Sequence, residues 1–474
     1  MTGPLWTFAD VLAATGGRVE GDGTPDISSV SFDSRTLEIG ALFAAIRGDN
    51  LDGHDFVKTA FAAGAVAALV AEDADVDALS GPLIRVADTL EALGQLGAAA
   101  RNRSDAKVIA VTGSVGKTGT KEALRLALGP SGETHASQKS YNNHWGVPLT
   151  LANFPPSADY GVFEVGMNHP GEITPLVRLV RPHVAIITTV EPVHLEFFDS
   201  VEQIAEAKAE IFLGLEPGGI AILNTDNPHF ERLAKRAREA GAGRIVGFGS
   251  GDGADARLIT MTGADDGSQV DAKIGDKLLS YRVGAAGRHL VMNSLAVLAA
   301  VEAVGADLEK AAATLSSYAA PVGRGARSYF ELDGGKIALI DESYNANPAS
   351  MRAALTALGD VPRSDHPRRV AVLGDMLELG ETSPELHADL AEPVDAAGVD
   401  VVFACGPHMR SLYDALPESR CGAYAENSDG LIRALPEAVK VGDVVMIKGS
   451  LGTRMGPLVE ALRAHLADRG ARAE

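Results

Sequence analysis

The sequence predicts an α/β protein of three domains. Its 474 residues are too many for a single hydrophobic core. Two long stretches alternate short apolar runs with helical patterns, which is typical of mostly parallel sheets covered by helices. A shorter stretch, split by glycine and aspartate, precedes both of them. We therefore expect domains at residues 1–85, 86–320 and 321–474.

The N-terminal stretch contains the longest apolar segment of the chain, at residues 60–71. This segment is rich in alanine and too short to span a bilayer, so we expect a helix that leads into a buried strand. Further along, an amphipathic pattern at residues 90–100 predicts a helix just after the first domain boundary.

The central stretch contains the strands of a mostly parallel sheet. Its apolar runs lie at residues 108–111, 160–165, 184–188 and 220–223. Helical patterns, such as those at residues 118–128 and 201–213, separate these runs. Residues 251–281 instead alternate polar and apolar positions between turns, which predicts an antiparallel addition to the sheet.

The C-terminal stretch repeats the alternation and predicts a second, doubly wound unit of the Rossmann-like kind. Its apolar runs lie at residues 337–340, 370–373, 399–404 and 444–447. The last helical pattern covers residues 457–467. A unit of this length can form a core of its own.

The composition limits the partners and the compartment. Lys plus Arg number 42 against 63 Asp plus Glu, which gives a formal net charge of −21. Such a charge repels phosphate backbones and anionic lipid, so we expect no nucleic-acid partner and no membrane insertion. No signal-peptide pattern is visible, and the two cysteines, Cys405 and Cys421, fit a reducing compartment. We expect a cytoplasmic protein, and a monomer.

Residues 112–118, Thr-Gly-Ser-Val-Gly-Lys-Thr, carry the sharpest functional signal. They follow a predicted buried strand and precede a predicted helix, so backbone N–H groups and the positive helix end face any bound anion. Gly113 and Gly116 let the backbone approach a phosphate closely. Lys117 can contact the outer phosphates, and the hydroxyl of Thr118 can bind Mg²⁺. The pattern predicts a P-loop-type nucleotide site in the central sheet.

Phosphoryl transfer needs cations that neutralise the charge of the phosphates, and three further residues are candidates for this part of the site. Glu164 ends a predicted strand, where a functional carboxylate of a parallel sheet usually lies. His194 follows the third apolar run, in a loop where a single histidine is more often solvated. Lys208 falls near the apolar face of its predicted helix, and periodicity alone favours a lysine that extends its amine to solvent.

Taken together, these features resemble the Mur ligase family over nearly the whole chain. In the centre, the resemblance rests on the phosphate loop, residues 142–143, 146–150, 164–169, 171–172, 207–211 and 287–289, and Asn293. In the last third, it rests on residues 323–324, 341–348, 373–380 and 448–450. The strings Tyr-Asn-Ala-Asn-Pro and Gly-Asp-Met-Leu-Glu-Leu-Gly are far more specific than a glycine-rich loop.

The resemblance implies an ATP-dependent amide-bond ligase that activates a carboxylate as an acyl phosphate. The implied ATP-binding residues are Gly113, Ser114, Val115, Gly116, Lys117, Thr118, Asn293, Arg324, Asp341, Tyr344 and Asn345. Two Mg²⁺ ions would be held by Thr118, Glu164, His194 and a carbamylated Lys208. The catalytic residues would be Lys117, Glu164, His194 and Lys208.

The resemblance also implies the substrates. The substrate-specific parts are most similar to family members that join D-alanyl-D-alanine to UDP-N-acetylmuramoyl-tripeptide. The implied substrate-binding residues are Ser34, Arg35, Arg47, Gly48, Asn142, Asn143, Asn168, His169, Asn347 and Ser450. The first domain would bind the UDP end of the substrate. The third would close over ATP and bind the incoming dipeptide.

Two alternatives stay open. A related ligase could add a diamino acid to the UDP-muramoyl dipeptide, although the Asp-Asn-Pro-Arg string of such enzymes is absent from the third domain. A catalytically silent nucleotide-binding partner is disfavoured because Lys117, Thr118, Glu164 and Lys208 occur together. One departure from the family concerns the nucleotide: Gly119 follows the Lys-Thr pair where many members have Ser or Thr, which removes one possible phosphate hydroxyl.

Overall fold

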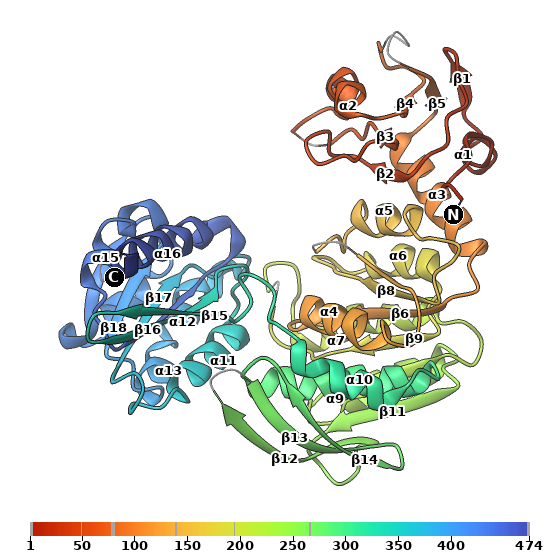
Figure 1. The fold of residues 1–474 in the computed structure, drawn as a ribbon. Helices are drawn as coiled ribbons and strands as arrows, with labels where there is room; N and C mark the ends of the chain where they lie inside the picture. The colour runs from red at the N-terminus through yellow and green to blue at the C-terminus, as the bar shows by residue number, and fades with distance from the viewer. Residues whose placement is uncertain are drawn as a thin grey trace.

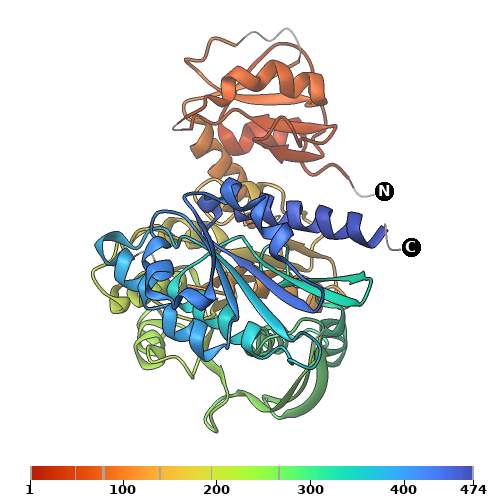
Figure 2. The ribbon, with the colours of Figure 1, turned by 90° about the vertical axis from the view of Figure 1, so that its left-hand side faces the viewer.

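The computed structural model describes residues 3–48, 50–76, 81–137, 140–193, 195–264 and 267–471. Three bodies follow one another along the chain, and each is built on one sheet (Figure 1). The N-terminal body lies at one end of the central body, and the C-terminal body lies beside the central body. The view turned by 90° places the C-terminal body in front of the central one (Figure 2). The predicted three-domain α/β class is confirmed.

The first sheet has the strand order β1-β5-β4-β3-β2, with only the β1–β5 pair antiparallel among its described strands. Its elements are α1 Phe8–Thr15, β1 Arg18–Glu20, β2 Ser29–Ser31, β3 Ala41–Ala44, α2 Val57–Ala63, β4 Ala67–Ala71 and β5 Leu83–Val86. Strands β3, β4 and β5 are buried at every position, as expected where parallel strands are covered on both faces. The predicted helix leading into a buried strand is α2 followed by β4.

Helix α3, Thr89–Asn102, leads from the first sheet to the second and packs against α5, Gly146–Ala152. Side-chain hydrogen bonds join the first body to this region. The indole Nε1 of Trp6 donates to the carbonyl of Ala152 at 2.7 Å. The amide side chain of Asn153 accepts from the N–H of Val30 at 2.8 Å and donates to its carbonyl at 2.9 Å. Asn153 therefore pairs with the open edge of β2 as a neighbouring strand would.

The second sheet has the order β14-β13-β12-β11-β10-β9-β6-β8-β7. Its strands are β6 Lys107–Thr112, β7 Thr134–Ala136, β8 Tyr160–Glu164, β9 Val184–Ile187, β10 Ile220–Asn224, β11 Arg244–Gly249, β12 Ala256–Ala264, β13 Gly267–Ile274 and β14 Lys277–Val283. Strands β6 to β11 pair in parallel, whereas β12, β13 and β14 form the predicted antiparallel addition. Figure 1 shows this addition at the edge of the body farthest from the N-terminal sheet.

Helices cover both faces of the second sheet. Along β6, Val108 and Ala110 face one hydrophobic cluster, while Ile109 and Val111 face another. The first cluster includes α5, α6 Ile173–Val180, α7 Val201–Ala209 and α8 Phe230–Glu239. The second includes α4 Lys117–Leu128, α9 Arg288–Ala303 and α10 Leu308–Thr314. The helix predicted over residues 201–213 is shorter than expected, because a 3₁₀ turn, Glu210–Gly214, replaces its last part.

The third sheet has the order β15-β16-β20-β17-β18-β19, and only the β15–β16 pair is antiparallel among the described strands. Its strands are β15 Ala326–Leu332, β16 Gly335–Glu342, β17 Arg368–Gly374, β18 Val401–Cys405, β19 Cys421–Ala425 and β20 Asp443–Lys448. Its helices are α11 Pro348–Gly359, α12 Ser383–Ala388, α13 Ala391–Ala396, α14 Arg410–Ala415, α15 Ala434–Ala438 and α16 Met455–Ala471. Residues of β17 again alternate between two apolar clusters, as a doubly wound unit requires.

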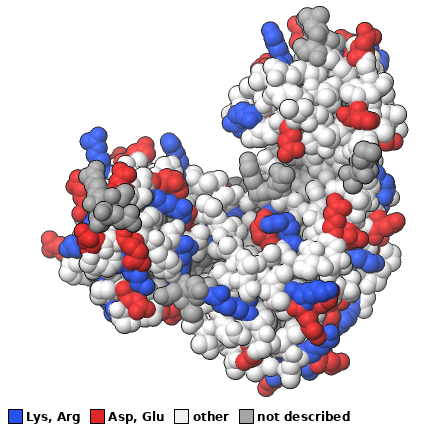
Figure 3. Space-filling view, viewed as in Figure 1, with Lys and Arg blue, Asp and Glu red and all other residues white. Residues whose placement is uncertain are grey.

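The space-filling view shows a hollow between the C-terminal body and the other two bodies (Figure 3). Acidic and basic side chains are mixed on both sides of this hollow. Within the described ranges, no helix combines the length and the apolar character needed to cross a bilayer.

Candidate functional site

The predicted phosphate loop lies between the end of β6 and the start of α4. Gly116 caps this helix with a left-handed backbone, φ 90°, and a Cβ there would lie 2.7 Å from the side-chain nitrogen of Asn293. Gly113 has φ 148°, and a Cβ there would collide with the hydroxyl of Thr188. Both positions therefore require glycine. The Nζ of Lys117 donates to the carbonyl of Gly113 at 2.7 Å.

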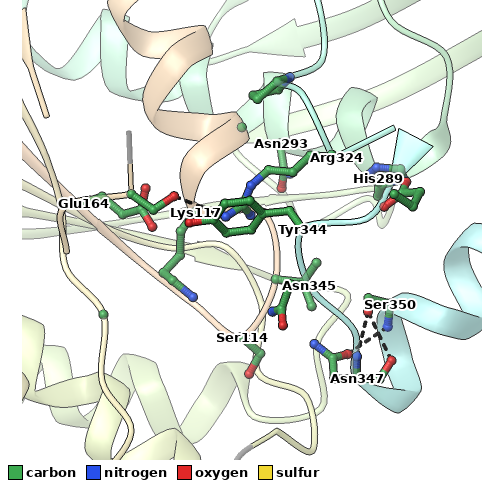
Figure 4. A pocket seen from close by; sticks show the side chains of 18 of the residues that line it. Ser114, Lys117, Glu164, His289, Asn293, Arg324, Tyr344, Asn345, Asn347 and Ser350 are labelled. Atoms are coloured by element: carbon green, nitrogen blue, oxygen red, sulfur yellow. Dashed lines mark hydrogen bonds between the residues drawn. The ribbon is translucent and has the colours of Figure 1, made fainter. Parts of the chain in front are cut away.

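A pocket opens in front of this loop, lined by residues of the central and C-terminal bodies. The sequence-predicted residues that line it are Ser114, Val115, Gly116, Lys117, Asn142, Glu164, Asn168, Asn293, Arg324, Tyr344, Asn345 and Asn347. Figure 4 shows Lys117 and Glu164 on one side of the pocket, with Tyr344 and Asn345 reaching in from the other. The two predicted halves of the nucleotide site thus meet in one place.

Glu164 ends β8 and is 1% exposed. Its Oε1 accepts from the Nδ2 of Asn142 at 2.7 Å, whereas its buried Oε2 has no hydrogen-bond partner. The nearby carboxylate partly opposes the effect of burial on Lys117, whose pKa is lowered mainly by desolvation. Thr118 is buried just behind the loop, with its hydroxyl 3.3 Å from that of Ser140. A buried carboxylate oxygen without a partner suits a hard cation.

Lys208 lies on α7 and is 2% exposed, so the interpretation of an amine extended to solvent is wrong. Desolvation lowers the pKa of Lys208 far below its ordinary value, and repulsion from Lys117 lowers it further. Burial therefore favours the neutral amine over the ammonium. His194 lies outside the described residues. Among those described, no group of three or more His, Cys, Asp or Glu side chains forms a ready cation site.

Arg324 joins the two bodies at the pocket. It lies on the segment between α10 and β15, and its guanidinium carbon is 4.2 Å from the ring centroid of Tyr344. The same guanidinium donates to the hydroxyl of Ser140 at 3.3 Å. Arg324 therefore contacts both sides of the pocket. Figure 4 shows it beside Tyr344.

Asp341 does not line the pocket, contrary to the expectation that it binds ATP. It is 2% exposed, and its carboxylate accepts from the N–H and hydroxyl of Ser343 and from the N–H of Gly323. The next residue, Glu342, lines the pocket instead and pairs with Lys448 at 3.2 Å. Successive strand residues face opposite sides, so Asp341 fixes the inter-domain segment while Glu342 faces the pocket.

Several predicted substrate residues have local structural partners. Asn347 lines the pocket but also caps α11 through reciprocal bonds with Ser350, drawn as dashed lines in Figure 4. Asn143, His169 and Ser450 do not line the pocket. Asn143 accepts from the N–H groups of Trp145 and Gly146 at the start of α5, and His169 contacts Glu172. Ser450 accepts from the N–H of Leu377 and donates to the carbonyl of Ala346.

The four predicted residues of the first body lie away from this pocket. Arg35 pairs with Asp33 at 2.8 Å beside the nearly buried Ser34. Arg47 pairs with Asp73 at 2.8 Å. Gly48 lies against the central body, because a Cβ there would be 2.8 Å from the ring of Trp145.

A second cavity lies where the first and central bodies meet. It is lined by residues 29–33 and 36–38, His135, Ala136, Tyr141, Leu149, Thr150 and Asn153. Ser34 and Arg35 are therefore next to it in sequence, but they do not line it.

Sequence reasoning assigned no role to several residues that line the first pocket. These are Gly119, Ser140, Gly166, Met167, His289, Leu290, Tyr318, Pro321, Gly323, Glu342, Ser350 and Lys448. Three of them, His289, Glu342 and Lys448, lie in sequence strings that carry the family resemblance. Lys448 also ends β20, and a position at the end of a parallel strand could have identified it as a site residue. Burial lowers the pKa of His289, and Glu342 partly opposes this effect. Nothing in the local sequence marks Tyr318.

Comparisons with known proteins agree with this geometry. The family description "Mur ligase middle domain" matches residues 111–301. The description "Mur ligase, glutamate ligase domain" matches residues 330–451, and "Mur ligase family, catalytic domain" matches residues 26–101.

Individual relatives are similar over almost the full length. A UDP-N-acetylmuramoyl-tripeptide–D-alanyl-D-alanine ligase of Rickettsia prowazekii is 33% identical over 96% of this chain and 99% of its own. A crystal structure of MurF from Acinetobacter baumannii superposes with a TM-score of 0.83 at 30% identity, covering 98% of this chain and 100% of that one. A MurF ligase of Thermotoga maritima, solved in complex with ADP, has a TM-score of 0.76 at 26% identity and covers 93% of this chain and 98% of its own.

Proposed function

The chain belongs to the Mur ligase family, and on this premise we propose that it joins D-alanyl-D-alanine to UDP-N-acetylmuramoyl-tripeptide at the expense of ATP. The product is the UDP-linked pentapeptide precursor of peptidoglycan, with ADP and phosphate released. The observation that carries the proposal is the single pocket in which the phosphate loop meets Arg324, Tyr344 and Asn345. Acyl-phosphate chemistry needs such a site at a domain boundary, because closure excludes water from the intermediate.

The reaction has two steps. The terminal carboxylate of the tripeptide attacks the γ-phosphorus of ATP, so a C–O–P bond forms and the bond to the ADP oxygen breaks. The amine of D-alanyl-D-alanine then attacks the acyl carbon, phosphate leaves from the tetrahedral intermediate, and the nitrogen loses a proton. Lys117 and the N–H groups that follow Gly113 are placed to stabilise the charge on the transferring phosphoryl group.

We infer that Thr118 and Glu164 hold a Mg²⁺ ion with the nucleotide. The unpartnered Oε2 of Glu164 fits this role, since a buried carboxylate oxygen otherwise costs free energy. Mg²⁺ would neutralise the phosphates and polarise the reacting phosphoryl oxygen when bound. The remaining nucleotide contacts would come from the loop amides, Asn293, Arg324, Tyr344 and Asn345, with Glu342 in place of Asp341.

We further infer that Lys208 is carbamylated in the active protein. A neutral amine attacks carbon dioxide, whereas an ammonium cannot, and the burial of Lys208 favours the neutral form. The resulting carbamate would be an anionic oxygen ligand for a second Mg²⁺, together with His194. This change also removes the repulsion that a cationic Lys208 would have with Lys117.

The three bodies would divide the substrates among them, with residues 1–85 binding the UDP end, 86–320 binding ATP and 321–474 binding the incoming dipeptide. Ser34, Arg35, Arg47 and Gly48 would act at the UDP end. Support for this comes from the second cavity, which is lined by the sequence neighbours of Ser34 and Arg35 and by Tyr141, the residue before Asn142.

A phosphate-release assay tests the proposal. With ATP, Mg²⁺ and UDP-N-acetylmuramoyl-tripeptide, we expect release with D-alanyl-D-alanine and little release with single amino acids. Release with a UDP-muramoyl dipeptide and a free diamino acid would favour the alternative ligase. Lys117→Ala should abolish release while Lys235→Ala, which removes an exposed lysine of α8, should not. Full activity of Lys117→Ala would contradict the proposed site.

A further inference from the structure

Tyr318 lines the nucleotide pocket, and no hydrogen bond within the described chain accounts for its hydroxyl. The residue follows the 3₁₀ turn Leu315–Ser317 and leads into the inter-domain segment that carries Arg324. Its side chain is 5% exposed and lines the pocket. The hydroxyl oxygen is buried without a hydrogen-bond partner in the described chain. Buried tyrosine hydroxyls usually have a partner, so this one indicates a missing ligand.

Gly119 leaves the space that the hydroxyl of Tyr318 fills. A Cβ added at Gly119 would lie 3.1 Å from this oxygen, which is closer than most real Cβ contacts. Gly119 has no left-handed backbone, so its conformation does not require glycine. Glycine inside a helix also costs stability relative to alanine. A serine or threonine at residue 119 would therefore compete with the hydroxyl of Tyr318 for the same position.

The position next to Gly119 is one where a phosphate would come close. Gly119 is the third residue of α4, and the first N–H groups of a helix have no partner within it. Lys117, Asn293 and Arg324 line the same part of the pocket. Burial raises the pKa of Tyr318 well above its ordinary value, so the phenol keeps its proton and can only donate to an anion.

We propose that the hydroxyl of Tyr318 donates a hydrogen bond to the phosphate chain of ATP, and so supplies the hydroxyl that Gly119 lacks. In this chain the donor comes instead from the segment that connects the central and C-terminal bodies. This inference rests on the proposed function, because it assumes that the pocket binds ATP.

A small cavity next to Tyr318 provides the competing explanation. It is lined by Gly119, Ala123, Val283, Leu290, Asn293, Ser294, Leu315 and Tyr318. A water molecule there could satisfy the hydroxyl, and Tyr318 would then act only in packing. The two explanations differ in what removal of the hydroxyl does to nucleotide affinity.

Tyr318→Phe tests the proposal in the full-length protein, with ADP binding measured by calorimetry and KM measured for each substrate. We expect the Kd of ADP and the KM of ATP to rise about tenfold, in line with a lost hydrogen bond to a charged group. The KM of the tripeptide substrate and the melting temperature should stay close to those of the wild type. Tyr413→Phe, which changes a tyrosine on α14 outside the pocket, serves as the matched control.

The double variant Gly119→Ser with Tyr318→Phe provides the reciprocal test. Gly119→Ser alone should weaken ADP binding, because the serine displaces Tyr318, whereas the double variant should bind ADP more tightly than either single variant. Unchanged ADP affinity in Tyr318→Phe, or purely additive losses in the double variant, would overturn the proposal. Failure of the wild type to bind ADP would instead reject the ATP site itself.

Discussion

Asn142 donates to only one oxygen of Glu164: its Nδ2 is 2.7 Å from Oε1, and the buried Oε2 has no partner in the described chain. The amide therefore fixes the orientation of the carboxylate and leaves one oxygen free for a cation. We expect Glu164→Gln to lower kcat by about a hundredfold, because the variant keeps the shape but loses the charge. A steady-state phosphate-release assay over a range of Mg²⁺ concentrations measures this effect.

The same titration separates cation binding from folding. If Glu164 binds Mg²⁺, the variant should need more Mg²⁺ for half-maximal activity. Glu239→Gln, on the exposed surface of α8, should behave as the wild type. An unchanged Mg²⁺ requirement in Glu164→Gln would show that the carboxylate has another role.

Lys208 gives the stability of the protein a pH dependence of predictable sign. In the unfolded chain a lysine ionises near pH 10.4, whereas burial lowers the pKa of folded Lys208 far below that value. Between these two pKa values the unfolded chain binds one more proton, so the free energy of unfolding rises with pH. We expect Lys208→Met to raise the melting temperature near pH 7 in buffer free of carbon dioxide, and to flatten this pH dependence.

If Lys208 is carbamylated, the activity of the protein should depend on carbon dioxide. Removal of carbon dioxide and bicarbonate should lower the activity of the wild type, and their return should restore it. The carbamate should give a ¹³C resonance in ¹³C-bicarbonate that is missing in Lys208→Met. An active protein without this resonance would contradict carbamylation of Lys208, and this result would not bear on the proposed ATP site.

The fold could be predicted wherever the signal is local. The burial of residues 108–111 on both faces of the sheet follows from the continuous apolar run. The phosphate loop follows from Gly113 and Gly116 between a predicted strand and a predicted helix. The choice between Asp341 and Glu342 could not be made locally, because both are acidic and lie at the same strand end. Only the pairing of β16 with β20 shows which side chain meets Lys448.

The contact between Tyr318 and Gly119 could not be predicted from the sequence either. Its proximity to Gly119 depends on how α10 and the turn that follows it pack against α4, and these segments are far apart in the chain. The sequence shows that residue 119 has no hydroxyl, but it does not show that the hydroxyl of Tyr318 lies next to it. The burial of Lys208 could not be predicted for a related reason, since helix periodicity does not show which other segments cover the edge of a helix.

Arg324 should matter for its shape as well as its charge. Its guanidinium stacks on Tyr344 and donates to Ser140, and a lysine can do neither in the same geometry. We expect Arg324→Lys to raise the KM of ATP by about tenfold, which corresponds to roughly 1.4 kcal/mol of lost binding. Arg178→Lys, on the exposed side of α6, is the matched control. Equal KM values in the two variants would exclude a role for the stacked guanidinium.

Leu195 couples the central body to the C-terminal one. Although it belongs to the central chain segment, it packs against the apolar cluster under the C-terminal sheet, and the N–H of Glu196 donates to the carbonyl of Glu378 at 3.4 Å. Glu378 has a left-handed backbone, φ 62°, which turns its carbonyl toward this contact. We expect Leu195→Ala to lower kcat severalfold while each body stays folded, because the half-buried leucine contributes only about 1 kcal/mol. Hydrogen exchange should increase at residues 195–199 and 378–382 but not in β6. Exchange that increases throughout the central sheet would show that Leu195 supports the fold and not the contact between the bodies.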